Sequence, residues 1–175
     1  MTALLARFSR VLTLLSTLAL WIAGVGLVAM TIAVAWQVYG RYVLGSTPRY
    51  TEALSVMLMA WFIFLGAAAG VRDRYHLGFD VLLYFMPLRV KYVMRSISDV
   101  VVFLFGVGMM VFGYQLAALG WSAAIPTLGI PGGLSFFPII TGGFLICLFS
   151  IERLWQRLAG LDPDGDRDLA QSVEG

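Results

Sequence analysis

The sequence predicts an all-α integral membrane protein of four transmembrane helices and one short interfacial arm helix. Of its 175 residues, 60% are apolar and 13% are charged, and the mean hydropathy is +0.87. Soluble domains hold about 25% charged residues, so a soluble fold of this size could not bury so much apolar surface. Four apolar runs reach the roughly 17 to 25 residues that a spanning helix needs. Because lipid offers no water to satisfy loose backbone groups, helices are the expected conformation.

The predicted spans cover residues 11–39, 52–71, 93–119 and 134–155. Glu52 and Arg72 bracket the second span about twenty residues apart, which at 1.5 Å per residue is roughly 30 Å, the thickness of bilayer hydrocarbon. The first span follows basic residues as a signal peptide would, but it exceeds the roughly 7 to 15 apolar residues of such a peptide, so we expect it to stay uncleaved. The four spans make up a membrane domain over residues 1–160. The acidic tail, residues 161–175, is expected to be disordered.

A shorter apolar piece, LGFDVLLYFMP (77–87), lies between the second and third spans. It is too short to cross a bilayer and is predicted to be an interfacial or re-entrant helix. His76 and Asp80 mark its beginning, and Pro87 either ends this helix or opens the next one.

The basic residues orient the protein. With four spans both termini lie on one side, which holds all of the 12 Lys and Arg residues except Arg41 and Arg49. The positive-inside rule then predicts that both termini are cytoplasmic and that the uncharged loop 120–138 faces outward. The third span begins with Lys91, Arg95 and Asp99 at four-residue steps, so these charges share a stripe that should be turned away from lipid.

Glu52 is open to two interpretations. An acid inside a span marks proton or cation pathways in some small exporters. Thr47 and Pro48 are, however, the expected N-cap and first helical residue, which places Glu52 near a helix start, where the helix dipole stabilises a carboxylate. We therefore expect a structural role, with Arg41 pairing to Glu52 near the outer face. A self-sufficient homo-oligomeric exporter or channel that uses Glu52 is the alternative.

The remaining polar residues predict no catalytic, cofactor or metal site. His76 is the sole histidine, whereas a b-type haem between membrane helices usually needs a facing pair. His76 and Asp80 have no further ligands nearby for a metal. No nucleophile triad or paired-carboxylate grouping lies on one side of the membrane, so we do not expect an enzyme. A membrane anchor for a redox enzyme is a further alternative, which a haem absorption band would reveal.

The run from Gly66 to Gly70 has the Gly-x-x-x-Gly spacing of a helix-packing ridge. In lipid, helices associate through close backbone approach. We expect the ridge to pack tightly against another helix, either of this chain or of a partner.

In their order along the chain, several of these residues give a resemblance to a known family. The chain resembles the small membrane subunit of tripartite ATP-independent periplasmic (TRAP) transporters, the DctQ-like proteins. The match rests on Gly40-Arg41-Tyr42-Val43-Leu44-Gly45, Glu52, Trp61, Phe64-Leu65-Gly66-Ala67, Arg72, His76, Asp80 and Leu128-Gly129-Ile130-Pro131. Family members often carry two adjacent acids and a tryptophan, with an arginine shortly after, where this chain reads Arg49-Tyr50-Thr51-Glu52-Ala53-Leu54-Ser55, so a role resting on the doubled acid or on that arginine does not transfer.

The resemblance implies a non-catalytic small permease subunit in the bacterial inner membrane. Its implied partners are a large multi-span permease that carries the sodium and substrate sites and moves like an elevator, a periplasmic substrate-binding protein, and membrane phospholipids. The implied cargo is an organic acid such as a dicarboxylate or a sugar acid. No cofactor is expected in this chain, and a net charge of +2 is too small to suggest a nucleic-acid partner. The candidate interface or structural residues are Arg41, Tyr42, Gly45, Glu52, Trp61, Gly66, Gly70, Arg72, His76, Asp80, Gly129 and Pro131.

Overall fold

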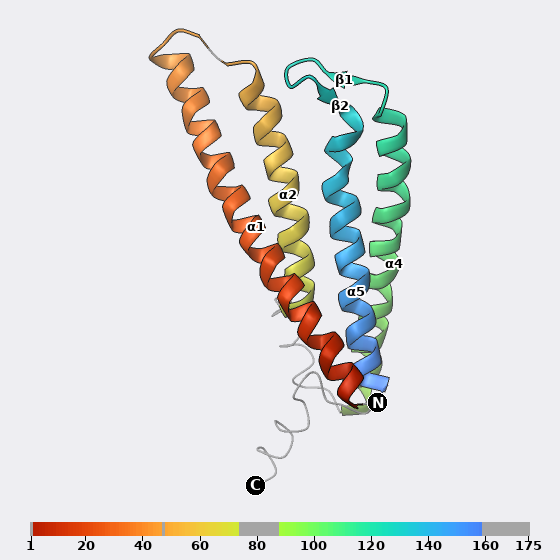
Figure 1. The fold of residues 1–175 in the computed structure, drawn as a ribbon. Helices are drawn as coiled ribbons and strands as arrows, with labels where there is room; N and C mark the ends of the chain where they lie inside the picture. Colours follow the sequence, from red (N-terminus) through yellow and green to blue (C-terminus); the bar gives the residue numbers. More distant parts are fainter. Residues whose placement is uncertain (1, 47, 74–87, 159–175) are drawn as a thin grey trace.

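The computed structural model describes residues 2–46, 48–73 and 88–158 (Figure 1). Its long helices are α1 (Thr2–Tyr42), α2 (Tyr50–Asp73), α4 (Leu88–Gly120) and α5 (Phe137–Leu158). Between α4 and α5 lie the short strands β1 (Ala124–Ile125) and β2 (Ile130–Pro131) and the 3-10 helix η1 (Gly132–Phe136).

Four stretches are long and apolar enough to cross a membrane, which confirms the predicted fold class. They run over Phe8–Tyr42, Tyr50–Arg72, Val93–Gly120 and Gly132–Arg157. The arm helix predicted at 77–87, with His76 and Asp80, and the tail predicted at 161–175 lie outside the described residues.

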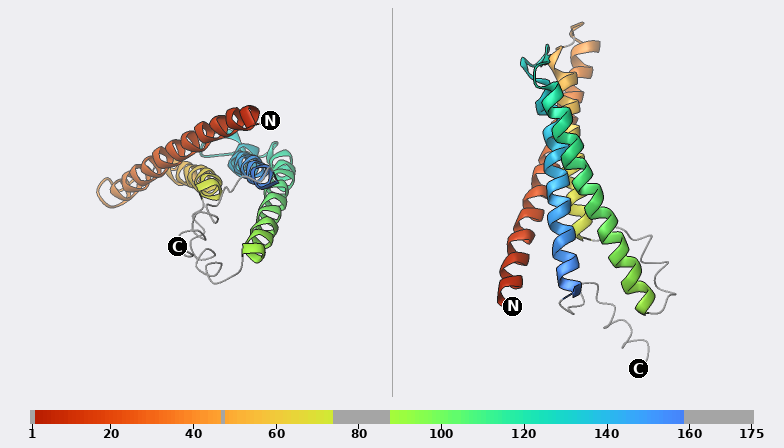
Figure 2. Two further views of the ribbon diagram at one scale, coloured as in Figure 1. Left: turned by 90° about the horizontal axis from the view of Figure 1, so that it is seen from below. Right: turned by 90° about the vertical axis from the view of Figure 1, so that its right-hand side faces the viewer.

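The helices are arranged as a curved row rather than as a closed bundle. Helix α2 packs against α1 on one side and α5 on the other, and α4 packs against the far side of α5. Seen from below in Figure 2, α1 and α4 lie at the two ends of this row. Both end helices therefore present long faces to the surroundings. The span that contains α5 is the most enclosed: 44% of the residues in its most apolar 18-residue stretch are buried, against 17% in each of the spans of α1 and α2.

In the view of Figure 1 the α1–α2 pair and the α5–α4 pair draw together toward the end where α1 begins, which we call the converging end, and separate toward the hairpin, whereas the side view of Figure 2 shows the beginnings of α1 and α4 spread apart. Buried side chains gather in the converging half, around the fully enclosed Phe149 of α5 with Leu12 of α1 and Leu65 of α2. Helices α2 and α5 also touch nearer the hairpin, because a Cβ atom on Gly142 would lie only 2.8 Å from the Phe64 Cβ atom. Beyond that contact the α1–α2 pair and the α5–α4 pair diverge.

Small residues allow the close helix contacts. A Cβ atom on Gly66 would lie 3.9 Å from the Cβ atom of Ala23 in α1, and Ala68 and Ala69 are completely buried. Gly66, at the start of the ridge, thus faces α1 of this chain. Between α4 and α5 the approach is closer still, and close backbone contact of this kind is what associates helices in lipid.

The connection from α1 to α2 corrects one prediction. Gly45 adopts a φ of +64°, a conformation that suits a residue without a Cβ atom, and the Ser46 amide donates to the Gly40 carbonyl at 3.1 Å. Helix α2 begins at Tyr50, so the prediction of Pro48 as its first residue is wrong. Pro48 lies just before the helix, where its carbonyl accepts the Thr51 hydroxyl at 2.8 Å.

A small hairpin lies where α4 ends and η1 leads into α5. Ile125 is opposite Ile130 in the antiparallel register. Gly129, with a φ of +67°, forms the turn, and its amide donates to the Ile125 carbonyl at 2.9 Å. The Gly129 and Pro131 positions singled out in the sequence are therefore turn and strand positions of this hairpin.

Candidate functional site

Arg72, in the last turn of α2, joins three helices through one guanidinium group. Its Nε atom lies 3.3 Å from the Glu152 Oε2 atom of α5. Its Nη2 atom donates to the Thr13 hydroxyl at 2.8 Å and to the Ser9 carbonyl at 3.4 Å, both in α1. The guanidinium also lies over the Phe149 ring, 5.8 Å from the ring centre, a distance typical of cation–π contact.

Glu152 is the buried counter-charge of Arg72. Only 5% of its side chain is exposed, and its second oxygen accepts the Gln156 amide at 3.3 Å. One residue on, the Arg153 guanidinium donates to the Arg72 backbone carbonyl at 3.2 Å, which fixes the end of α2 against α5 a second time.

Asp99 joins α4 to α5 in the same way. Its carboxylate oxygens lie 2.9 Å from Arg157 Nη1 and 3.5 Å from Arg153 Nη1. Arg157 also donates to the Ser96 hydroxyl at 3.3 Å. The Asp99 and Arg157 side chains are only 8% and 4% exposed. The prediction that the charged stripe at the start of the third span turns inward is thus confirmed at Asp99.

Together these residues form one joint, which we call the charge cluster: Arg72, Asp99, Glu152, Arg153 and Arg157. It ties all four long helices together at their converging end. Charged side chains in membrane helices are costly unless they pair, and breaking a buried pair leaves an uncompensated charge. Each acid of the cluster is engaged by at least one arginine of a neighbouring helix or turn, so the arrangement suits holding helices rather than binding a solute. Among the described residues, no group of three or more His, Cys, Asp or Glu could hold a metal ion.

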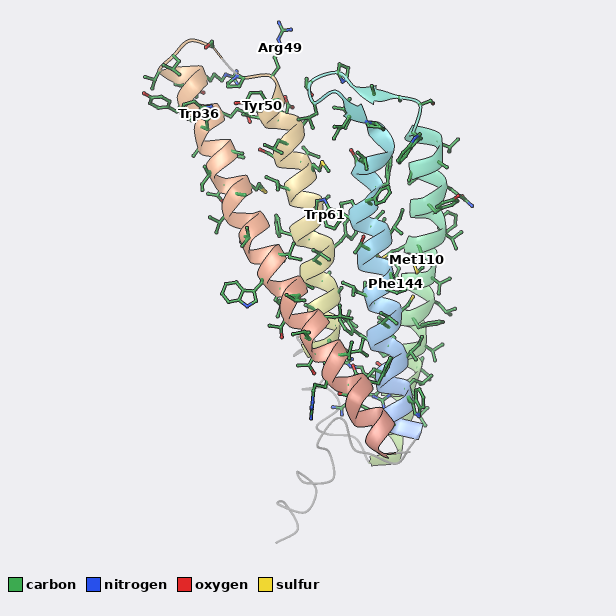
Figure 3. The ribbon with its side chains drawn as sticks, viewed as in Figure 1. Trp36, Arg49, Tyr50, Trp61, Met110 and Phe144 are labelled. Carbon is green, nitrogen blue, oxygen red and sulfur yellow. The ribbon has the colours of Figure 1, made fainter. Side chains whose placement is uncertain are left out.

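The structure does not gather the sequence-predicted residues into one site. Arg72 lies in the charge cluster, whereas Trp61 lies earlier in α2, nearer the hairpin, and between α2 and α5 (Figure 3). Gly66 and the half-buried Gly70 follow it on the same helix. The others that the structure describes lie at the opposite end, in the α1–α2 connection, the start of α2 and the hairpin: Arg41, Tyr42, Gly45, Glu52, Gly129 and Pro131.

The predicted pair between Arg41 and Glu52 does not form. Within the described ranges, no ion pair at 4.0 Å or less joins Arg41 to Glu52, and both side chains are exposed. Arg41 lies in the last turn of α1, whereas Glu52 lies in the first turn of α2 and lines a groove that faces the hairpin. Glu52 thus points away from α1, although its place near the start of a helix is as predicted.

Sequence reasoning missed Glu152 altogether. The signal that could have found it is the alternation of Glu152, Arg153, Gln156 and Arg157 over the last turns of an apolar span. Residues four apart share one face of a helix, so Glu152 aligns with Gln156 and Arg153 with Arg157, and within a span these charged faces must meet protein rather than lipid.

The fold and the charge cluster define a class: an integral membrane protein whose buried charges join its own helices. Residues 30–160 match the family described as tripartite ATP-independent periplasmic transporters, DctQ component. A putative TRAP transporter small permease protein of Haemophilus influenzae is 28% identical over 135 residues, covering 73% of this chain and 80% of the relative. The C4-dicarboxylate TRAP transporter small permease protein DctQ of Vibrio cholerae is 32% identical over 63 residues, covering 36% of this chain and 27% of that protein.

The chain belongs to the DctQ family and is a small permease component of a TRAP transporter. The resemblance noted from its sequence motifs is thereby confirmed.

Proposed function

We propose that this chain is the non-catalytic stator of a sodium-driven TRAP transporter in the bacterial inner membrane. In this scheme it scaffolds a large elevator-type permease that takes up organic acids, such as dicarboxylates or sugar acids, from a periplasmic binding protein. The observation that carries the proposal is the charge cluster, because it engages the buried charges of the spans in holding α1, α2, α4 and α5 in a fixed relation.

The open row of helices supports the same role. A closed four-helix bundle buries its inner faces against itself, whereas this row leaves both α1 and α4 with long apolar surfaces. A stator needs such a broad, fixed surface on which a moving domain can slide. Sodium and substrate would bind in the large subunit, and this chain would need no cofactor.

The proposed orientation places the charge cluster at the cytoplasmic side and the hairpin at the periplasmic side. Arg72, Arg153 and Arg157 belong to the end that is rich in basic residues, as the positive-inside rule requires of a cytoplasmic end. Both termini would then be cytoplasmic, and the hairpin and the α1–α2 connection would face the periplasm.

The alternative of an exporter built around Glu52 receives less support from the geometry. Glu52 lies in the first turn of α2 and is exposed. The residues of α2 that line this groove reach only as far as Ala60, and one turn later Phe64 contacts Gly142 of α5.

Reconstitution tests the proposal. The purified chain, its large permease partner, and both together are placed in liposomes with an inward sodium gradient and the binding protein outside. Uptake of a labelled organic acid is expected only when both subunits and the binding protein are present, and the two subunits should copurify. Solute uptake by this chain alone would overturn the proposal.

A further inference from the structure

A groove with one polar end lies between the outer half of α2 and the hairpin. Its volume is about 390 Å³. One wall is a stripe of α2, and the other is formed by the hairpin and η1. The lining residues are Arg49, Glu52, Ala53, Val56, Met57, Ala60, Ile125, Thr127 and Ser135. Figure 3 shows Arg49 at the outer end of α2 and Trp61 farther in, between α2 and α5.

The groove matches one leaflet of a bilayer in length. From Arg49 to Ala60 the chain is almost entirely helical, so at 1.5 Å per residue this wall is about 16 Å long. One leaflet contributes about half of the roughly 30 Å of bilayer hydrocarbon. The apolar residues Ala53, Val56, Met57 and Ala60 thus lie at the depth of an acyl chain, and one turn further along α2 Phe64 contacts Gly142 of α5.

The mouth of the groove carries two opposite charges that could be satisfied from outside. Arg49 and Glu52 are both exposed, and no ion pair within the described residues engages either of them. A guanidinium binds phosphate oxygens with two parallel hydrogen bonds, and a carboxylate accepts from an ammonium group. Thr127 and Ser135 also line the groove, and each carries a hydroxyl that can donate or accept a hydrogen bond.

We propose that this groove binds one zwitterionic phospholipid of the outer leaflet, of the phosphatidylethanolamine type. Its phosphate would meet Arg49, its ammonium group would meet Glu52, and one acyl chain would lie along Ala53, Val56, Met57 and Ala60. The lipid fills the gap where the α1–α2 and α5–α4 pairs diverge and so fixes their separation at the outer end, as the charge cluster does at the inner end. The inference rests on the proposed orientation of the hairpin and not on sodium-driven transport.

Native mass spectrometry of the purified full chain tests the proposal. The detergent-solubilised protein is titrated with phosphatidylethanolamine or with phosphatidylglycerol, which has the phosphate but lacks the ammonium group. The wild type should retain one phosphatidylethanolamine in preference to phosphatidylglycerol. Glu52→Gln should weaken phosphatidylethanolamine binding about fivefold, as the loss of one partly exposed ion pair of about 1 kcal/mol predicts, and should leave phosphatidylglycerol binding unchanged. Arg49→Gln should weaken both.

A second pair of variants tests the acyl-chain part of the groove. Ala60→Trp fills the floor and should abolish retention of either lipid. Met59→Trp is the matched control, because Met59 is 40% exposed on α2 and does not line the groove. If Ala60→Trp fails to fold, Ala53→Leu narrows the same groove with less added bulk.

Three results would overturn the proposal. The first is equal retention of the two lipids by the wild type with no effect of Glu52→Gln. The second is equal behaviour of the Ala60→Trp and Met59→Trp variants. The third is a groove that takes no phospholipid but becomes protected from a thiol reagent at Thr127→Cys when the large subunit or the binding protein is added, which would assign the groove to a protein partner.

Discussion

The Arg72 guanidinium and the Glu152 carboxylate lie where neither charge is well solvated. Their side chains are 17% and 5% exposed, and the Nε and Oε2 atoms lie 3.3 Å apart. In such surroundings the net contribution of a pair can be small, but the loss of one partner is costly, because the other charge stays buried without compensation.

Glu152→Ala is therefore expected to lower the stability of the protein by about 3 kcal/mol. Replacing both partners, in Arg72→Met with Glu152→Met, should recover a large part of this loss because no buried charge is then left alone. Thermal unfolding in detergent measures both effects. Arg41→Ala is the matched control, since that charged side chain is exposed and lines no part of the groove, and it should change stability by less than about 0.5 kcal/mol. Equal unfolding temperatures for Glu152→Ala and Arg41→Ala would contradict the buried pair.

The charged residues show how far the sequence predicts the site. The cost of a charge in lipid was enough to predict that Asp99 turns inward, and the family motif selected Arg72. The partner of Arg72 could not be predicted, because Glu152 is 80 positions away and sequence spacing does not reveal which helices are neighbours. The Arg41–Glu52 pair failed for a related reason. Opposite charges at the ends of consecutive helices need not face each other, and here the first turn of α2 presents Glu52 to the hairpin.

At the scale of the helices, packing depends on where backbones can approach. A Cβ atom on Gly106 of α4 would lie 2.8 Å from the Cys147 sulfur and 3.0 Å from the Gly143 carbonyl oxygen of α5. A Cβ atom on Gly108, two residues later, would meet nothing within 4 Å. A methyl group added at Gly106 would therefore press against α5, whereas one added at Gly108 would meet open space.

Gly106→Ala should destabilise the protein by roughly 1 to 3 kcal/mol, because the added methyl group must push α4 away from α5. Gly108→Ala should leave stability unchanged or raise it by up to about 1 kcal/mol, since alanine is the better helix former. The unfolding temperatures of the two variants in the same detergent check this ordering. If Gly108→Ala is the more damaging change, α5 does not pack on the Gly106 side of α4.

The contact of α2 with α1 can be tested by a cross-link. The Cβ positions of Ala23 and Gly66 are 3.9 Å apart, which lies within the roughly 3.5 to 4.5 Å of a disulfide. In a Cys147→Ser background, Ala23→Cys with Gly66→Cys should form a disulfide within one chain upon mild oxidation, as measured by the loss of free thiols in a monomeric band. Gly24→Cys with Gly66→Cys is the control and should not form one. A cross-linked dimer instead would mean that the Gly66 ridge faces another chain.

The sequence predicted the helices better than their order. Hydropathy alone located the spans, because about twenty apolar residues in a row have few alternatives to crossing a bilayer. It could not order them as α1, α2, α5 and α4, since in lipid the exposed faces are as apolar as the buried ones and carry no pattern. Exposed residues such as Leu14 and Phe105 look no different in the sequence from buried ones such as Leu12 and Phe149.

At the scale of the whole molecule, the two ends of the row differ in chemistry. The converging end holds the charge cluster and the beginning of α1, and the open end holds the hairpin and the α1–α2 connection. A structure that is fixed at one end and open at the other can keep its inner end rigid while its outer end adapts to a lipid or a partner. In the proposed orientation, the charge cluster faces the cytoplasm.

Thiol labelling from outside the cell tests that orientation. In a Cys147→Ser background, Thr127→Cys places an exposed thiol in the hairpin, and Arg10→Cys places one on the exposed side of the first turns of α1. A membrane-impermeant maleimide added to spheroplasts should label Thr127→Cys at once and should label Arg10→Cys only after the membrane is permeabilised. The asymmetry of basic residues survives the loss of Arg10, so the variant should keep its topology. Labelling of Arg10→Cys in intact spheroplasts would reverse the orientation, and would also place the Arg49–Glu52 groove in the inner leaflet.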